Sequence, residues 1–520
     1  MEDILKDITP RDYQKNIAKT CIDKNTLVVL PTGLGKTLIA LIVAIDRLKK
    51  YPDKKILILA PTKPLVEQHK ISFLEKLPED YAKIELFTGT VKAEKRKTIW
   101  ETANIIFSTP QCIANDLKKG LYTLRDVSLL VEDEAHRCVR NYDYAYIAKR
   151  YNLEAEFPRA IGLTASPGSD VDKIKEIGIN LHIKDIELRT RESWDVKDYL
   201  QELEFTKHEL DLPAELVEMK SMMQIIYDTY IDDLRRREFL FGQDNKLALL
   251  QLQKKIGLQI NQNIHSRESF IAMSACAQAI KLLHGIELIS TQTVESFTKY
   301  IETLQKNGEK RESKGTTKLV NNSMFQKIRQ NALACMQKGM EHPKVDEVNR
   351  IIRDEHLENK DNKSIIFTQF RETAEILSKN LNKIDGIKSK VFIGQAKKDG
   401  KGLSQKEQKK MIEEFRNREI NILVATCIAE EGLDIPEVNS VVFYEPVSSA
   451  IRSIQRRGRT ARLSKGKLIM LLTKGTKDEF ANYASRAREK KMTAQIQKVK
   501  DILTERGTLR QPTDPQRKLF

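Results

Sequence analysis

The chain has 520 residues and a mass of 59.8 kDa, so at roughly 100–200 residues per domain it should contain two to four domains. Hydrophobic residues make up 40% and charged residues 31%, a balance that excludes collagen-like, mucin-like and wholly disordered chains. The net charge of +16 suits a polyanionic partner. Apolar runs such as "TLVVL" and "NIIFS" have the length of strands and are far shorter than the roughly 20 residues of a membrane span.

The N-terminal segment "MEDILKDITPRDYQK" has no basic region followed by an apolar stretch, so we expect no signal peptide and a cytoplasmic, nucleoid-associated location in a prokaryote. The six cysteines form no CxxC pair and have no histidine pair nearby. We therefore expect reduced, buried thiols, not zinc ligands or disulfides.

Residues 1–194 alternate short apolar runs with amphipathic stretches. This alternation is typical of βαβ units and predicts a parallel sheet in an α/β domain. The expected strands are Leu27–Leu30, Ile56–Ala60, Ile105–Ser108, Leu129–Glu132 and Ala160–Leu163.

Residues 195–340 are expected to form an all-α insert domain. After Pro213, apolar residues recur at steps of three or four, which predicts one face of a helix. The face consists of Leu216, Met219, Met223, Ile226, Tyr230 and Leu234. Arg235, Arg236 and Arg237 end this helix and either contact phosphate or offset the negative helix end. The polar run "KNGEKRESKGT" (306–316) is interpreted as a loop.

The βα pattern resumes over residues 341–490, which predicts a second α/β domain. Its expected strands are Ser364–Thr368, Ile422–Ala425, Ser440–Tyr444 and Leu468–Leu472. Residues 491–520 are expected to hold the end of a C-terminal helix and a polar tail.

A strand, a Gly-bearing turn and a helix are predicted in "VVLPTGLGKTLIA" (Val28–Ala40). Gly33 and Gly35 let the backbone turn its N–H groups toward a phosphate at the positive end of the helix. Lys36 would reach the β- and γ-phosphates, and the Thr37 hydroxyl would hold Mg²⁺. The strict P-loop pattern has a glycine where this sequence has Leu30, so the match is incomplete.

Two carboxylates end the hydrophobic strand of "LLVEDEAHR" (Leu129–Arg137). Asp133 can hold Mg²⁺ and Glu134 can deprotonate an attacking water, or the pair can be a solvated acidic turn. Glu132 is unexpected, because a parallel strand buried on both faces should be apolar throughout.

Arginines crowd around a glycine in "SIQRRGRTAR" (Ser453–Arg462). A solvated charged face is the common reading of such a run, and the alternative is stabilisation of charge on a transferring γ-phosphate. "ATCIAEEGLDIP" (Ala425–Pro436) also suits a loop that faces a nucleotide.

In this order, these four segments resemble helicase superfamily 2. Further matching segments are "RDYQ" (11–14), "APTKPLVEQH" (60–69), "STPQ" (108–111), "TAS" (164–166) and "IIFTQFRETA" (365–374). More closely, "LAPTKPLV", "IGLTASPGS", "EEGLDIPEV" and "FYEPVSSAIRSIQRRGRTAR" look like the archaeal Hef and eukaryotic FANCM helicases. The resemblance covers about residues 9–500 and implies two RecA-like motor domains with a helical insert between them. Archaeal Hef proteins often carry an XPF-related nuclease, whose acidic motif is not found in these 520 residues.

The resemblance also implies roles for individual residues. Gln14 would read adenine, with ATP and Mg²⁺ bound by Thr32, Gly33, Leu34, Gly35, Lys36, Thr37 and Asp133. Glu134 would activate water, and Gly432, Asp434, Gln455, Arg459 and Arg462 would face the nucleotide from the second domain. His136, Thr164 and Ser166 would couple hydrolysis to domain movement. The backbone of a nucleic acid would contact Thr62, Lys63, Thr109, Gln111, Thr368, Gln395 and Thr426.

The expected function is that of an ATP-dependent DNA helicase or translocase on branched or forked DNA, with a separate nuclease or other repair proteins as possible partners. DNA is favoured by resemblance only. The alternatives are an RNA-duplex-activated ATPase and a non-catalytic ATP-binding nucleic-acid clamp.

Overall fold

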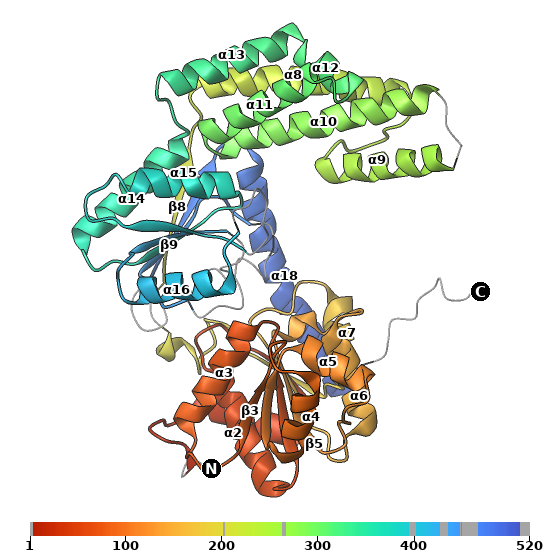
Figure 1. The fold of residues 1–520 in the computed structure, drawn as a ribbon, viewed down its shortest axis with the longest axis vertical. Coiled ribbons are helices and arrows are strands. Elements are labelled where there is room, and N and C mark those ends of the chain that lie inside the picture. Colours follow the sequence, from red (N-terminus) through yellow and green to blue (C-terminus); the bar gives the residue numbers. More distant parts are fainter. Residues whose placement is uncertain are drawn as a thin grey trace.

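The computed structural model describes residues 4–200, 203–262, 267–394, 402–426, 435–447, 449 and 466–509. Two parallel-sheet domains and a bundle of helices follow one another from bottom to top in Figure 1. A long C-terminal helix runs between them. The predicted class, two α/β motor domains with an all-α domain, is confirmed.

The first motor domain contains a seven-stranded parallel sheet in the order β3-β4-β2-β5-β6-β1-β7. Its strands are β1 (Thr26–Val29), β2 (Lys55–Leu59), β3 (Ile84–Phe87), β4 (Ile105–Ser108), β5 (Val127–Asp133), β6 (Ala160–Thr164) and β7 (Asp185–Leu188). Helices α1 (Asp12–Asp23), α2 (Lys36–Lys50) and α3 (Lys63–Lys76) contribute to the core on one face. Helices α4 (Ala93–Thr102), α5 (Pro110–Lys118), α6 (Asp143–Glu154) and α7 (Val171–Asn180) contribute to the core on the other.

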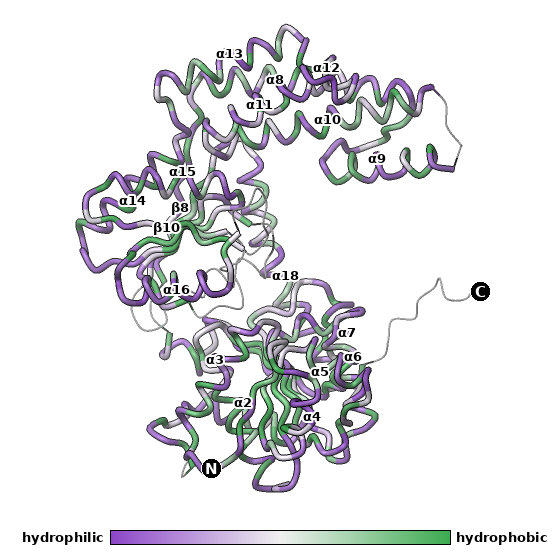
Figure 2. The backbone as a smooth tube through the Cα atoms, in the orientation of Figure 1, coloured by the Kyte–Doolittle hydropathy of each residue, from purple (hydrophilic) through white to green (hydrophobic). Residues whose placement is uncertain are grey.

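The central strands of this sheet are apolar on both faces, because helices cover both. Every residue of β1, β4, β5 and β6 is buried. These strands form the hydrophobic centre of the domain in Figure 2. Because all seven strands are parallel, the loops that follow β1, β2, β4 and β5 meet at one edge of the sheet.

The second motor domain contains a six-stranded parallel sheet in the order β10-β11-β9-β12-β13-β8. Its strands are β8 (Leu203–Leu210), β9 (Ser364–Phe367), β10 (Ser389–Phe392), β11 (Ile422–Ala425), β12 (Ser440–Phe443) and β13 (Gly466–Thr473). Helices α14 (Pro343–Glu358) and α15 (Arg371–Leu381) pack on one face, and α16 (Gln405–Arg416) packs on the other.

The position of β8 corrects the expected boundary of the insert at residue 195. β8 pairs with β13 from Leu203 to Leu210, so the chain enters the second sheet before it forms the helices. The strand was missed because it lies at the edge of the sheet and alternates exposed with half-buried side chains. The helical domain is therefore an insertion within the second motor domain.

The helical bundle consists of α8 (Ala214–Arg236), α9 (Lys246–Asn261), α10 (Arg267–Thr291), α11 (Val294–Glu309), α12 (Lys314–Val320) and α13 (Ser323–Gln337). The predicted loop over 306–316 is wrong for most of its length, because α11 and α12 leave only residues 310–313 between them. The Ser313 hydroxyl accepts a hydrogen bond from Thr316 N and caps α12. By length and composition α10 could cross a membrane, but it packs against α8, α9 and α11, and 44% of its apolar window is buried.

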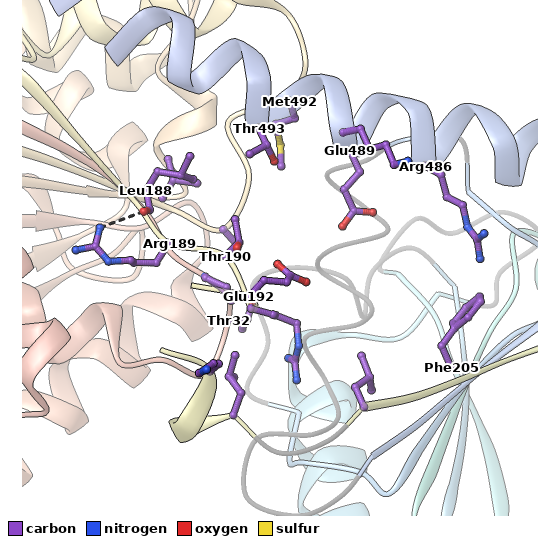
Figure 3. A pocket seen from close by; sticks show the side chains of 18 of the residues that line it. Thr32, Leu188, Arg189, Thr190, Glu192, Phe205, Arg486, Glu489, Met492 and Thr493 are labelled. Atoms are coloured by element: carbon purple, nitrogen blue, oxygen red, sulfur yellow. Dashed lines mark hydrogen bonds between the residues drawn. The ribbon is translucent and has the colours of Figure 1, made fainter. Parts of the chain in front are cut away.

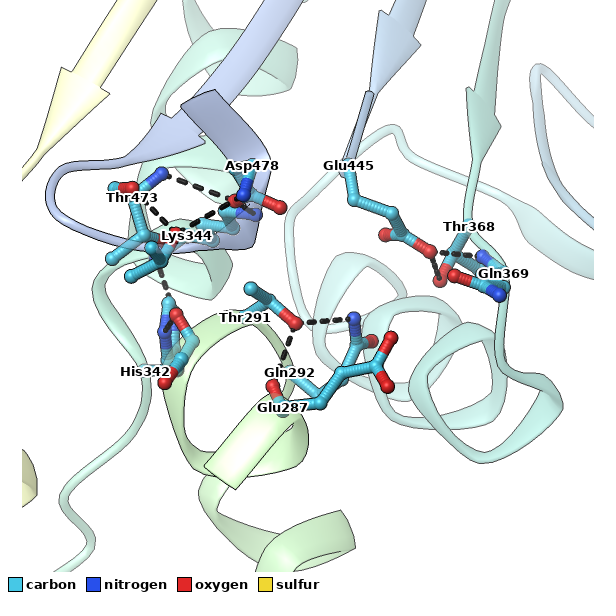
Figure 4. A network of polar contacts seen from close by, with 12 residues as sticks. Glu287, Thr291, Gln292, His342, Lys344, Thr368, Gln369, Glu445, Thr473 and Asp478 are labelled. Atoms are coloured by element: carbon cyan, nitrogen blue, oxygen red, sulfur yellow. Dashed lines mark hydrogen bonds and ion pairs between the residues drawn. The ribbon is translucent and has the colours of Figure 1, made fainter. Parts of the chain in front are cut away.

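A buried ion pair joins the second motor domain to the start of the last helix. The Lys344 ammonium donates to Asp478, and both side chains are almost fully buried. Nearby, His342 Nε2 lies 3.2 Å from Ser290 O of the bundle, and the Thr373 hydroxyl donates to Gln292 (Figure 4). Removing one partner of a buried pair typically costs about 3–5 kcal/mol, so substitution of Lys344 or Asp478 alone should destabilise this junction.

The last helix, α18 (Lys477–Arg506), is continuous across the boundary expected at residue 490 and contacts all three parts of the protein. It packs against β13, against α10 of the bundle, and against α7 and β7 of the first motor domain. Its buried residues Met492, Ile496, Val499 and Leu503 recur at steps of four, three and four and complete the core of the first domain. Residues 491–506 thus belong structurally to the first motor domain.

Candidate functional site

The loop between β1 and α2 has the backbone of a phosphate-binding loop despite the irregular Leu30. Gly33 and Gly35 have φ of 88° and 76°, in the left-handed region that favours glycine. A Cβ on Gly35 would lie 2.3 Å from Gln14 Nε2, so a side chain there would displace the Gln14 amide. The positive N-terminal end of α2 faces this loop and suits an anion, and Leu38 N donates to Gly35 O at 2.9 Å.

The Lys36 ammonium folds back into this loop. Its Nζ donates to the carbonyl oxygens of Leu30, at 2.9 Å, and Pro31, at 3.5 Å. The Lys36 ammonium, which is predicted to bind a phosphate, therefore lies inside the glycine-bearing turn.

The segment "RDYQ" at the start of α1 lies directly against the loop. Gln14 is buried, and its Nε2 donates to Leu34 O at 3.1 Å while its Oε1 accepts from Arg11 N at 2.9 Å. Tyr13, which the sequence did not single out, donates its hydroxyl to the same Leu34 oxygen at 2.9 Å. The Arg11 guanidinium lies 4.6 Å from the ring centre of Tyr199, an aromatic side chain that sequence reasoning also missed.

The two predicted Mg²⁺ ligands are connected by a third residue. His69 of α3 has Nδ1 3.1 Å from Thr37 Oγ1 and Nε2 2.8 Å from Asp133 Oδ2. His69 and Asp133 are both buried, with exposed fractions of 7% and 5%. No role was assigned to His69 from the sequence, although it ends the segment "APTKPLVEQH", because only Thr62 and Lys63 of that segment were assigned, as nucleic-acid contacts.

Asp133 remains a carboxylate at this site. Burial alone would raise its pKa, but the hydrogen bond with His69 and the positive charge of Lys36 hold that pKa below its usual value. A buried carboxylate and a threonine hydroxyl supply the hard oxygen atoms that Mg²⁺ prefers. Together with the glycine turn and Lys36, these residues fit a magnesium–triphosphate group.

The predicted general base, Glu134, has an unusual backbone. Its φ of 53° and ψ of 47° are left-handed, which is uncommon for a residue with a side chain. Its Oε2 lies 3.2 Å from His136 Nδ1, and the same nitrogen lies 3.4 Å from Thr164 Oγ1. His136 therefore connects the acidic turn to the "TAS" segment.

Glu132 is buried completely in the core between β5 and α6. Among the described residues neither of its oxygens accepts a hydrogen bond from a nitrogen or an oxygen, and the nearby Cys138 thiol is only a weak donor. Burial raises the pKa of this carboxyl to about 8, although the Cys138 thiol acts in the opposite direction. The side chain points away from the nucleotide loop, into the cluster that contains Cys138 and Tyr144.

A cavity of about 1220 Å³ lies beside the P-loop and is lined by both motor domains. Pro31 and Thr32 border it from the first domain, and Phe205 borders it from β8 of the second (Figure 3). Arg486, Glu489 and Met492 of α18 line it as well. Ser166 of the "TAS" segment donates to Met492 Sδ at 2.9 Å, and Ser166 N donates to Thr164 Oγ1 at 3.1 Å.

The described candidates for nucleic-acid contact follow the carboxyl ends of strands. Thr62 stands at the N-cap position of α3 after β2, and Thr109 at that of α5 after β4. Lys63 and Gln111 lie in the first turns of these helices. In the second sheet, Thr368 and Thr426 directly follow β9 and β11, and the Thr368 hydroxyl donates to Glu445 at 3.3 Å.

Six predicted site residues lie outside the described residues: Gln395, Gly432, Asp434, Gln455, Arg459 and Arg462. The arginine triplet at the end of α8 is described, and each member is paired with carboxylates. Arg235 pairs with Asp244, Arg236 with Asp233, and Arg237 with Asp233 and Glu268. These pairs favour the interpretation that the triplet balances local charge.

The crystal structure of the Hef helicase domain of Pyrococcus furiosus has the same architecture. It is 42% identical to this chain with a TM-score of 0.73, and the match covers 92% of this chain and 98% of that domain. The chain belongs to the Hef/FANCM family of superfamily 2 helicases. Three family models match successive parts of the chain. They are the DEAD/DEAH box helicase (11–174), the putative ATP-dependent RNA helicase helical bundle (231–339) and the helicase conserved C-terminal domain (343–464).

Two curated relatives align over nearly the whole of this Hef-family chain. The putative ATP-dependent RNA helicase MJ1505 of Methanocaldococcus jannaschii is 38% identical over 96% of the chain. The ATP-dependent DNA helicase fml1 of Schizosaccharomyces pombe is 31% identical over 90% of the chain. The chain spans only 62% and 57% of the lengths of these relatives.

Proposed function

We propose that this chain is an ATP-dependent DNA helicase or translocase that acts on branched DNA, such as forks, in replication-fork repair or recombination. The supporting observation is that Lys36, Thr37, Asp133 and Glu134 converge at one edge of the first sheet. A cavity lined by both motor domains lies beside them. A nucleotide bound there can therefore control how the two domains close on each other.

In this proposal each residue of the first-domain site has a separate role in ATP hydrolysis. Lys36 binds the triphosphate, Gln14 selects adenine, and Glu134 accepts a proton from the attacking water. Thr37 and Asp133 hold Mg²⁺, which neutralises charge on the phosphates.

The second domain completes the site when the cleft closes. Gly432 and Asp434 face the nucleotide, Gln455 contacts the γ-phosphate region, and Arg459 and Arg462 stabilise the charge of the transition state. Hydrolysis reopens the cleft, and His136, Thr164 and Ser166 pass the change between the acidic turn, the "TAS" segment and α18.

The nucleic-acid strand lies along the ends of both sheets. Backbone contacts come from Thr62, Lys63, Thr109, Gln111, Thr368, Gln395 and Thr426, whose short or flexible polar side chains position phosphates without reading sequence. The helical bundle grips duplex near the branch. In this proposal the protein works in the cytoplasm at the nucleoid, beside a nuclease or other repair proteins.

RNA duplex is the second candidate substrate. The observation in its favour is that the names of the M. jannaschii relative and of the matching helical-bundle family both specify RNA helicases. DNA is favoured by the name of the S. pombe relative.

A substrate panel tests both. ATPase activity and strand separation are measured with single strands, forks, Holliday junctions and RNA duplexes, and Glu134→Gln serves as the control for contaminating ATPases. We expect the highest activity with forked DNA. Higher activity with RNA duplex would establish the second candidate, and no ATPase activity with any substrate would support a non-catalytic clamp.

Deletion of residues 211–340 tests the role of the bundle. The deleted segment lies between β8 and α14 of the second domain, so the deletion leaves the nucleotide loops of the first domain unchanged. We expect ATP binding to remain and the preference for forks over single strands to fall. An unchanged preference would assign branch recognition to the motor domains.

A further inference from the structure

The imidazole of His69 contacts both Thr37 and Asp133. In a neutral imidazole one ring nitrogen donates and the other accepts. Because the Asp133 carboxylate can only accept, Nε2 carries a proton, and in this neutral tautomer Nδ1 accepts from the Thr37 hydroxyl. This arrangement satisfies both ring nitrogens in a buried position.

The arrangement leaves the metal-binding atoms available. In the neutral tautomer the Thr37 hydroxyl directs its hydrogen toward His69, so His69 does not occupy the lone pairs of Oγ1. His69 contacts only Oδ2 of Asp133, so it does not occupy Oδ1. Groups that hydrogen-bond to metal ligands in this way orient them and typically change metal affinity or activity by about 10–100-fold when removed.

His69 also belongs to the helix that begins at two proposed nucleic-acid contacts. Thr62 is the N-cap of α3 and Lys63 is its first residue. At about 1.5 Å per residue, His69 lies roughly 9 Å further along the helix axis than Lys63. Val66 and Phe73, each 1% exposed, anchor α3 in the core on either side of His69 along the sequence. A shift at the start of α3 therefore moves His69 with it.

We propose that His69 is a positioning residue that links the nucleic-acid contacts at the start of α3 to the Mg²⁺ ligands Thr37 and Asp133. The inference rests on the proposed function, because it requires that the chain bind both Mg²⁺–nucleotide and a strand. A nucleic-acid strand bound to Thr62 and Lys63 fixes the position of α3, and His69 then holds Thr37 and Asp133 in the positions that bind Mg²⁺. Nucleotide binds more tightly when the strand is present, and by reciprocity the strand binds more tightly when nucleotide is present.

Three variants of the full chain separate the two hydrogen bonds. His69→Asn places a polar atom near the position of Nδ1 and keeps the bond to Thr37. His69→Gln places one near the position of Nε2 and keeps the bond to Asp133. His69→Ala removes both. Ile71→Ala is the matched control, because Ile71 lies in the same helix and its side chain is 54% exposed.

The first measurement is binding of a fluorescent non-hydrolysable ATP analogue as a function of Mg²⁺ concentration. We expect His69→Ala to raise the half-saturating Mg²⁺ concentration about 10-fold or more, with Asn and Gln intermediate. Ile71→Ala should match the wild type. A Mg²⁺ dependence of His69→Ala equal to that of the wild type, in a folded protein, would overturn the inference.

The second measurement is the affinity for the analogue with and without a single-stranded oligonucleotide. The wild type should show coupling of about 5-fold or more, a usual magnitude between linked sites. In His69→Ala the ratio should approach one while oligonucleotide affinity without nucleotide stays unchanged. Wild-type coupling that persists in His69→Ala would refute the link. Failure of the wild type to bind either partner would instead refute the proposed function.

Discussion

Ser166 of the first motor domain donates its hydroxyl to the sulfur of Met492, 2.9 Å away, in a helix that follows the second motor domain. The two residues are 326 positions apart in the chain. Ser166 is 1% exposed and Met492 6% exposed, so the contact is inside the protein. The "TAS" segment is thus held by a structure that only the C-terminal part of the chain supplies.

Met492→Leu should lower stability by about 1 kcal/mol, because the volume of the side chain is nearly conserved while the buried Ser166 hydroxyl loses its acceptor. Thermal or urea unfolding of Met492→Leu, Ser166→Ala and the double variant forms a cycle. We expect an interaction energy of about 0.5–1 kcal/mol. Strict additivity would show that the hydroxyl–sulfur contact contributes nothing.

Glu132→Leu should stabilise the protein at neutral pH. Burial raises the pKa of this carboxyl from 4.5 to about 8, so folding binds a proton that the unfolded chain has lost. The cost is absent below pH 4.5, grows as the pH rises to about 8, and amounts to roughly 3 kcal/mol at pH 7.

Unfolding free energies of wild type and Glu132→Leu between pH 5 and about 8 give the test, since the difference should widen with rising pH. Glu101→Gln, at an exposed position, is the control and should follow the wild type. A difference that does not depend on pH would mean that Glu132 has a partner when ionised.

Glu134→Gln should reduce ATP turnover about 10²–10⁴-fold, the usual effect of removing a general base. Nucleotide and DNA affinities should remain, because Lys36, Thr37 and Asp133 are unaltered. Single-turnover hydrolysis together with nucleotide binding measures both. Turnover close to that of the wild type would assign the base to another residue.

Gly35→Ala should abolish tight nucleotide binding. The φ of 76° disfavours a side chain, and the new Cβ would lie 2.3 Å from Gln14 Nε2. Together these effects should exceed 1.4 kcal/mol, which is a tenfold loss of affinity.

Gly120→Ala is the matched control for this prediction. Its φ of 67° is similar, but nothing lies within 4 Å of a Cβ there, and it is far from the nucleotide loop. It should lose a similar amount of stability from backbone strain and no nucleotide affinity. Equal affinity losses in both variants would mean that backbone strain alone explains the effect.

The strands that the sequence predicted are the buried ones in the middle of each sheet, because side chains on both faces must be apolar. The missed strands β3, β7, β8 and β10 are the four edges of the two sheets. Edge strands carry polar and half-exposed residues, as in "DIEL" of β7, and so lack a continuous apolar run.

The candidate site was predicted where local spacing sets its geometry, as in the glycine turn before Lys36. His69 and Met492 could not be found in this way, because their partners come from distant segments that only the fold brings together. The helical interpretation of α8 succeeded because its apolar face has a clear period, whereas the short α12 is too polar to show one.

The pairing of β8 with β13 has a consequence for the order in which the protein folds. The seven strands of the first sheet come from one continuous stretch of chain, so they can pair soon after synthesis. β8 is made next, but its partner β13 follows after about half of the chain, and contacts of such long range form slowly. Until β13 emerges, β8 is an unpaired strand at risk of pairing with other molecules. The bundle must therefore collapse on its own between the two strands. The second sheet is complete only after β13, and α18 completes the core of the first motor domain later still.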